Sequence, residues 1–222
     1  MSEERLYTEG PAPLESHEVW LRALTKPSVA TFEEIVVDPH ASTSRAYKWV
    51  FLMSLVSQAI TLLGGWLSGR SLYDSLDAWE GANATLWTII CSPVSAGIAV
   101  LAFMISAGIL QWVAGLLGGS GRFDHLVIAI AAYQAPLAAV SALLSVIMAW
   151  LPPAACLGAP LSIYLAVLHV MAIKAVNRFS WERAVTAVLA PLAVLFLVVC
   201  VVTLIGVAVL GPALERALEG WI

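Results

Sequence analysis

Charged residues are scarce in this sequence. Asp, Glu, Lys and Arg make up 12% of its 222 residues, whereas 60% are hydrophobic, and the mean hydropathy is +0.89. No charged residue occurs between Glu80 and Arg122. Soluble domains carry about 25% charged residues. This composition therefore excludes a water-soluble globular fold.

Cysteine is also scarce, because the chain has only Cys91, Cys156 and Cys200, which lie far apart. Three scattered cysteines exclude a disulfide framework and a zinc site built from thiolates. A removable signal peptide is not expected either. The first thirteen residues are polar and acidic and lack a basic stretch leading into an apolar core.

Five long apolar runs stand out instead. About 20 apolar residues suffice for a helix to cross a hydrocarbon core roughly 30 Å thick, and continuous runs do not fit the alternating pattern of a membrane β-barrel. We therefore predict an all-α polytopic membrane protein, with residues 1–45 as an N-terminal segment and 46–222 as a five-span membrane domain. The predicted spans are Trp49–Leu67, Leu86–Leu116, Leu126–Trp150, Leu157–Val176 and Ala184–Leu210.

The distribution of cations predicts the orientation, because Lys and Arg are retained on the cytoplasmic side. With five spans, nine of the eleven cations fall on the side of the N-terminus, and only Arg70 and Arg216 fall on the other. We therefore expect a protein of the cell membrane with a cytoplasmic N-terminus and an external C-terminus. The acidic residues Asp74, Asp77 and Glu80 would then be external.

Two short amphipathic helices are predicted before the first span. Residues 14–24 combine apolar and charged residues around Trp20, and Pro27, which follows them, interrupts the helix. A second helix is expected to start near Thr31, which has the capping-box spacing with Glu34, and to carry Phe32. These helices either lie in the headgroup layer or pack against the ends of the spans.

The third span is predicted to be central in the bundle. Ala131, Ala135 and Ala139 recur at every fourth position, and small residues let helix backbones approach closely where lipid removes the hydrophobic drive for association. Pro93 and Pro136 interrupt the hydrogen bonding of their helices, so we expect kinks there.

Few polar groups lie deep in the spans. The deepest are Tyr133, Gln134 and His169. His169 is a candidate ligand for a metal or a tetrapyrrole, although its own span offers no second ligand at helical spacing. The alternative is a neutral imidazole hydrogen-bonded to a neighbouring helix. The scarcity of buried charge argues against an ion-coupled transporter.

The densest local motif is the turn Gly118-Gly119-Ser120-Gly121-Arg122-Phe123. Its glycines and Arg122 are candidates for an anion-binding nest. The motif is not a phosphate-binding P-loop, because no Lys-Ser or Lys-Thr pair follows and no strand precedes it. The alternative is a flexible hairpin between two helices, with Phe123 buried at their interface.

The order of these features resembles the Yip family of five-span membrane proteins, named for interaction with Ypt/Rab-type GTPases. The resemblance is carried by Lys26-Pro27, Thr31-Phe32 and Asp38-Pro39, by the glycine-rich turn with Phe123, by Ala132-Tyr133 with Pro136, and by Ala190-Pro191. It implies five spans and a cytoplasmic N-terminus. For bacterial-type members it implies no established substrate or reaction.

These observations favour a non-enzymatic membrane scaffold or accessory subunit that binds lipids, other integral membrane proteins or itself. The alternative is a permease-like protein for a neutral or lipid-like solute. No cofactor, metal or nucleic-acid partner is expected. The candidate interaction residues are Trp20, Phe32, Gly118, Gly119, Arg122, Phe123, Tyr133 and Pro136.

The orientation can be tested with single cysteines placed at Ser75 and Ser120, which fall on opposite sides in this topology. In intact cells a membrane-impermeant thiol reagent is expected to label the cysteine at position 75 and to leave the one at position 120 unmodified. Equal labelling of both from outside would overturn the orientation.

Overall fold

The computed structural model describes residues 14–68, 78–151 and 156–219, and these residues form seven helices without a strand. Five of the helices are long and apolar enough to cross a membrane. The all-α prediction and the five spans are therefore confirmed. The helices are α1 (Ser16–Thr25), α2 (Val29–Val37), α3 (Thr43–Ser68), α4 (Ala78–Leu116), α5 (Phe123–Trp150), α6 (Gly158–Asn177) and α7 (Trp181–Glu219).

The helices extend beyond the predicted spans at several ends. The helix α3 begins at Thr43 rather than near Trp49, because its first turns are amphipathic: Ala46 is buried and Lys48 is exposed. Both α4 and α7 are 39 residues long, almost twice the length that a span requires. The predicted loop residues Arg70, Asp74 and Asp77 lie outside the described residues, as do the side chains of Glu80 and Arg216.

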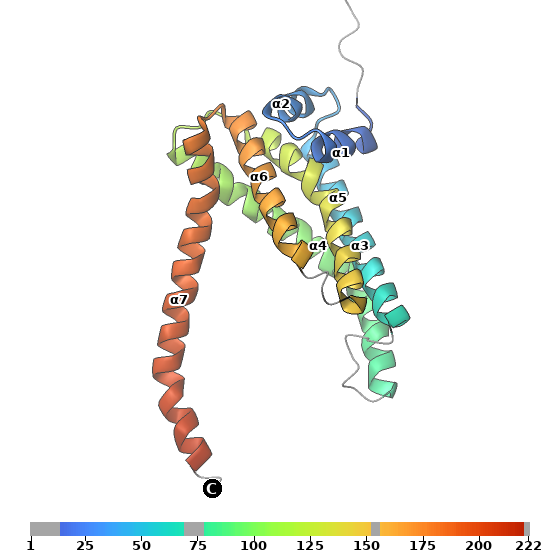
Figure 1. Cartoon of the computed structure of the whole chain (residues 1–222), viewed down its shortest axis with the longest axis vertical. Helices are drawn as coiled ribbons and strands as arrows, with labels where there is room; N and C mark the ends of the chain where they lie inside the picture. The colour runs from blue at the N-terminus through green and yellow to red at the C-terminus, as the bar shows by residue number, and fades with distance from the viewer. Residues whose placement is uncertain (1–13, 69–77, 152–155, 220–222) are drawn as a thin grey trace, which may run out of the picture.

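The two N-terminal helices lie across one end of the bundle (Figure 1), which is called the α1–α2 end below. They pack on α5, and α2 also packs on α6. Of the two predicted arrangements, packing against the ends of the spans is therefore the one observed. The predicted cap at Thr31 was wrong. Ser28 caps α2, because its Oγ accepts the backbone N–H of Thr31 at 3.0 Å.

Arg45 fastens the N-terminal segment to the first span. Its guanidinium donates to the carbonyl of Leu14 at 2.8 Å and pairs with the buried carboxylate of Asp38 at 3.6 Å. The same group lies over the ring of Trp49, 4.9 Å from the centroid, and the Trp49 Nε1 donates to Ser16 Oγ at 3.1 Å. These contacts fix α1 against the start of α3.

The helix α5 is the central element of the bundle. In its most apolar window 67% of the residues are buried, compared with 11% for α3, α4 and α7 and 22% for α6. It contacts α3, α4, α6 and both N-terminal helices. The prediction of a central third span, made from its small residues, is therefore confirmed.

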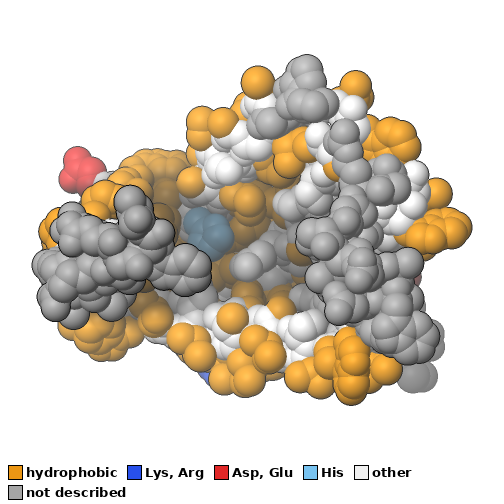
Figure 2. Space-filling model, turned by 90° about the horizontal axis from the view of Figure 1, so that it is seen from below, with side chains coloured by type: hydrophobic (Ala, Val, Ile, Leu, Met, Phe, Trp, Pro, Cys, Tyr) orange, Lys and Arg blue, Asp and Glu red, His pale blue; other side chains and the backbone are white. Residues whose placement is uncertain are grey.

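The last span stands apart over much of its length. Figure 1 shows α7 meeting α4 and α6 near the α1–α2 end and then diverging from the bundle. Between Leu192 and Val202 most of its side chains are exposed. Seen from the opposite end, the described surface is largely hydrophobic and is hollowed between the helices (Figure 2). Such a surface suits lipid rather than water.

Two glycines give a matched test of the packing between α3 and α5. A Cβ at Gly64 would lie 2.5 Å or less from the methyl groups of Val146, whereas a Cβ at Gly108 would meet nothing within 4 Å. We expect Gly64→Ala to lower the detergent melting temperature, because overpacking costs about 1–3 kcal/mol. Gly108→Ala should raise the melting temperature or leave it unchanged, because Ala is the better helix former. Melting temperatures that shift equally would contradict a tight α3–α5 contact.

Candidate functional site

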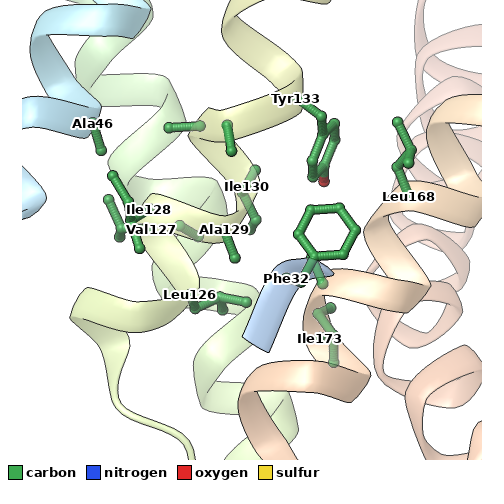
Figure 3. Close-up of a cluster of buried hydrophobic side chains, with 14 of the residues drawn as sticks. Phe32, Ala46, Leu126, Val127, Ile128, Ala129, Ile130, Tyr133, Leu168 and Ile173 are labelled. Carbon is green, nitrogen blue, oxygen red and sulfur yellow. The ribbon is translucent and has the colours of Figure 1, made fainter. Parts of the chain in front are cut away.

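The predicted interaction residues Phe32 and Tyr133 contact each other inside the protein. Both side chains are fully buried, and their rings meet edge to face with centroids 5.9 Å apart. Figure 3 shows Phe32 of α2 pointing toward Tyr133 of α5, with Leu168 and Ile173 of α6 beside them. Phe32 therefore anchors α2 in the groove between α5 and α6. The hydroxyl of Tyr133 is buried and has no hydrogen-bond partner among the described residues.

Trp20 and Pro136 lie apart from this cluster. The indole of Trp20 packs edge to face on Trp49 with centroids 5.7 Å apart, and its buried Nε1 has no partner in the described part of the chain. Pro136 lies within α5, which continues for fourteen more residues to Trp150. Both residues are only partly buried. The structure thus places Trp20 at the α1–α2 end and Pro136 in the membrane interior.

The glycine-rich turn ends α4 with a Schellman motif. Gly118 adopts the left-handed conformation with φ +84°, and its N–H donates to the carbonyl of Gly115 at 3.0 Å. The N–H of Gly119 donates to the carbonyl of Ala114 at 2.8 Å. These two bonds satisfy carbonyls that a helix end leaves unpaired. Because both N–H groups are occupied, they are not free to bind an anion.

Asn177, which the sequence analysis missed, joins this turn to the end of α6. Its side chain is buried, and Oδ1 accepts the backbone N–H of Gly121 at 3.1 Å. Gln111 of α4 donates from Nε2 to the carbonyl of Gly121 at 2.6 Å and lies 3.4 Å from the same Oδ1. Asn177 Nδ2 donates in turn to the carbonyl of Ile173. We call Gln111, Gly121 and Asn177 the polar junction.

Close approach explains why glycines occupy the turn. A Cβ at Gly121 would lie 2.7 Å from the backbone oxygen of Val176 and 2.7 Å from Asn177 Oδ1. A Cβ at Gly119 would lie 2.5 Å from the same Oδ1. The glycines are thus required for helix packing. The signal in the sequence was an amide near the end of each of two predicted spans: Gln111 lies within about two turns of the end of the second span, and Asn177 directly follows the fourth.

Arg122 and Phe123 lie at the start of α5, next to the polar junction. The Arg122 side chain is exposed and reaches Asp124 at 3.4 Å, while Phe123 is partly buried against the core. Asp124 also accepts a hydrogen bond from Thr43 Oγ1 at 3.0 Å. The structure therefore brings the turn residues together with Asn177, but not with Trp20 or Phe32.

A groove with polar groups lies inside the membrane region between α3, α4 and α5. Its volume is about 360 Å³. The amide of Gln134 lines it together with the hydroxyl groups of Ser54 and Ser106. Small side chains form most of the remaining wall. The other lining residues are Val50, Ala99, Ala102, Phe103, Ala135 and Ala138. We call this feature the Gln134 groove.

The Gln134 side chain is exposed, and within the described part of the chain its amide has no hydrogen-bond partner. It lies eleven residues into α5, which corresponds to about 16 Å along the helix axis. This depth is near the middle of a hydrocarbon core. The amide is therefore a free polar group in the most apolar part of the membrane.

His169 lies in α6 against the central helix. Its ring packs edge to face on Tyr133 with centroids 5.3 Å apart. Its Nδ1 lies 3.3 Å from the carbonyl of Leu165, so the hydrogen bond is within α6 and not to a neighbouring helix as predicted. Among the described residues no three His, Cys, Asp or Glu side chains lie close enough to hold a metal.

Comparison with known proteins adds one finding. The family model described as the Yip1 domain matches residues 21–203, which include the second half of α1, all of α2 to α6 and the first part of α7. A search of curated proteins found no match. A search of solved structures found none either.

The polar junction can be tested by a double-mutant cycle. We expect Asn177→Ala to destabilise the protein in detergent by about 1–3 kcal/mol, because it leaves the N–H of Gly121 unpaired in a buried site. Gln111→Ala should also destabilise it. The effects of the two substitutions should not add, because both residues bond Gly121. Strictly additive losses of stability would show that the two side chains act independently.

Proposed function

Because this chain belongs to the Yip family of integral membrane proteins, we propose that it is a non-enzymatic scaffold or accessory subunit that binds other membrane proteins. Its contact with a partner is made within the bilayer. The partner contributes a transmembrane helix that occupies the Gln134 groove and hydrogen-bonds its amide.

The unpaired amide of Gln134 carries this proposal. A polar group without a hydrogen bond in hydrocarbon costs several kcal/mol. Lipid chains offer no hydrogen-bonding group, whereas a backbone carbonyl or polar side chain of a neighbouring helix does. Membrane helices associate in this way, through small residues that allow close approach and through interhelical hydrogen bonds. The groove combines Gln134 with Ala99, Ala102 and Ala138.

Two other amides in the bundle support this interpretation by contrast. Gln111 donates to Gly121, and Gln58 accepts a hydrogen bond from Ser95 Oγ at 2.8 Å. These two amides therefore hydrogen-bond within the bundle. The Gln134 amide has no such bond among the described residues, and we assign it to a partner outside the chain.

We place the protein in the cell membrane with the α1–α2 end in the cytoplasm. Lys48, Arg122, Lys174, Arg178 and Arg183 lie at or near that end of the spans. Cations are retained on the cytoplasmic side of a membrane. The polar junction and the N-terminal helices would then be available to cytoplasmic partners.

A permease for a neutral solute is the second candidate. The same groove favours it, because a cavity of about 360 Å³ with one amide and two hydroxyl groups suits a small polar molecule. The two functions make different predictions in mild detergent. A scaffold co-purifies with a membrane protein, whereas a permease is a single monodisperse species that its solute stabilises against heat.

The helix-binding role is tested by replacing Gln134 with Leu. The tagged full-length protein is purified from membranes of the source organism in mild detergent, and co-purifying membrane proteins are quantified. We expect Gln134→Leu to remain folded and to recover its partner about 3- to 30-fold less, the contribution of one interhelical hydrogen bond. Gln58→Leu is the matched control and should keep the partner.

The outcome also identifies the kind of partner. Two differently tagged copies of this chain show whether the protein binds itself. If Gln134→Leu loses the second copy from the complex, the partner is another molecule of the same protein. Equal recovery of every co-purifying protein by wild type, Gln134→Leu and Gln58→Leu would overturn the helix-binding role. Turnover of a substrate by the pure protein, abolished by His169→Ala, would overturn the non-enzymatic assignment.

A further inference from the structure

A second groove lies on the outer surface of the bundle between α3 and α4. Its volume is about 750 Å³. Apolar side chains form most of its wall, and two polar residues, Ser44 and Lys48, stand at the end nearest the start of α3. The remaining lining residues are Tyr47, Phe51, Leu52, Gly97, Val100 and Leu101. We call this feature the α3–α4 groove.

The charge in this groove lies at one end. Lys48 is exposed, and its ammonium group has no ion pair among the described residues. It lies five residues, or about 8 Å, from the start of α3. A lysine at this position extends its head group to the membrane surface while its methylene stem covers apolar wall.

An acidic group that contacts the start of α3 is already paired. Asp124 belongs to the start of α5, accepts a hydrogen bond from Thr43 and pairs with Arg122 at 3.4 Å. Lys48, which has no ion pair among the described residues, is thus an unneutralised cation at one end of the apolar α3–α4 groove. This arrangement is complementary to an amphiphile with an anionic head group and an apolar chain.

Gly97 opens the groove on the side of α4. A Cβ at this position would meet nothing within 4 Å, so the missing side chain leaves space in the groove wall. The same is true of Gly108 on the same helix, but Gly108 does not line the groove. Both glycines therefore have open space around the Cβ position, but only Gly97 of the two lines the groove.

We propose that the α3–α4 groove binds an anionic phospholipid of the surrounding membrane. One acyl chain lies along Phe51, Leu52 and Val100, and Lys48 binds the phosphate group. Cations at a membrane surface favour anionic lipids, which gives the site its preference. This binding goes beyond the proposed helix-binding role and does not depend on it, because Gln134 does not line this groove.

Native mass spectrometry of the full-length protein in detergent tests the site. The protein is incubated separately with phosphatidylglycerol and phosphatidylcholine of identical acyl chains, and the retained lipid per protein is measured. The wild type is expected to retain more phosphatidylglycerol. Lys48→Gln should lower the ratio of retained phosphatidylglycerol to phosphatidylcholine about fivefold, because it removes one cation near the surface.

Gly97→Leu tests the acyl-chain site without changing the charge, because its side chain fills the groove and Lys48 is kept. We expect it to reduce retention of both lipids at least about fivefold, since the added side chain occupies the space of the acyl chain. Gly108→Leu is the matched control and should retain both lipids like the wild type. Both variants should melt at or above the wild-type temperature, because Leu is a better helix former than Gly.

Equal lipid retention by wild type, Gly97→Leu and Gly108→Leu would overturn the proposed site, and so would an unchanged preference in Lys48→Gln. If Gly97→Leu melts well below the wild type, the smaller substitution Gly97→Val replaces it with the same expected loss. Recovery of the membrane-protein partner is measured in parallel and should be unchanged in Gly97→Leu. A loss of lipid and a loss of partner are thus separately observable.

Discussion

The structure depends on the close packing of α5 against its neighbours. Within lipid, burying an apolar side chain between helices gains little, because the hydrocarbon is as apolar as the side chain itself. Association must come from van der Waals contact at short range, and this requires small residues. Ala129, Ala131 and Ala132 of α5 are fully or almost fully buried, and Gly64 of α3 brings its backbone against Val146. The other spans and the N-terminal helices are arranged around this contact.

At the α1–α2 end, polar groups take over the role of the small residues. Asn177 and Gln111 join two helix ends through the backbone of Gly121, and Arg45 holds α1 to α3. Hydrogen bonds of this kind have direction, so they fix where each helix ends and how the next one begins. Apolar packing in the bilayer fixes the distance between helices, and the polar contacts at this end fix their register.

Much of the fold was predictable from the sequence because a membrane span is a local property. Five apolar runs gave five spans, and the row of alanines in the third run identified the central helix. Helix ends were less predictable, since amphipathic turns such as the start of α3 lack an apolar signal and Ser28 competes with Thr31 for the cap of α2. The polar junction was missed because a single sequence does not show that Gln111 and Asn177 meet. Their contact arises only when α4 and α6 end side by side.

The candidate sites illustrate what identifies an interface on a protein in lipid. In water an exposed apolar surface indicates a binding site, because hydration of that surface is unfavourable. In a bilayer the same surface is solvated, so the exposed side chains of α7 and most of the apolar face in Figure 2 indicate no partner by themselves. The informative groups are those that acyl chains cannot satisfy. Gln134 has an amide that hydrocarbon cannot hydrogen-bond, and Lys48 has a charge that acyl chains cannot neutralise. We therefore propose these two residues as the points where the chain meets something other than acyl chains.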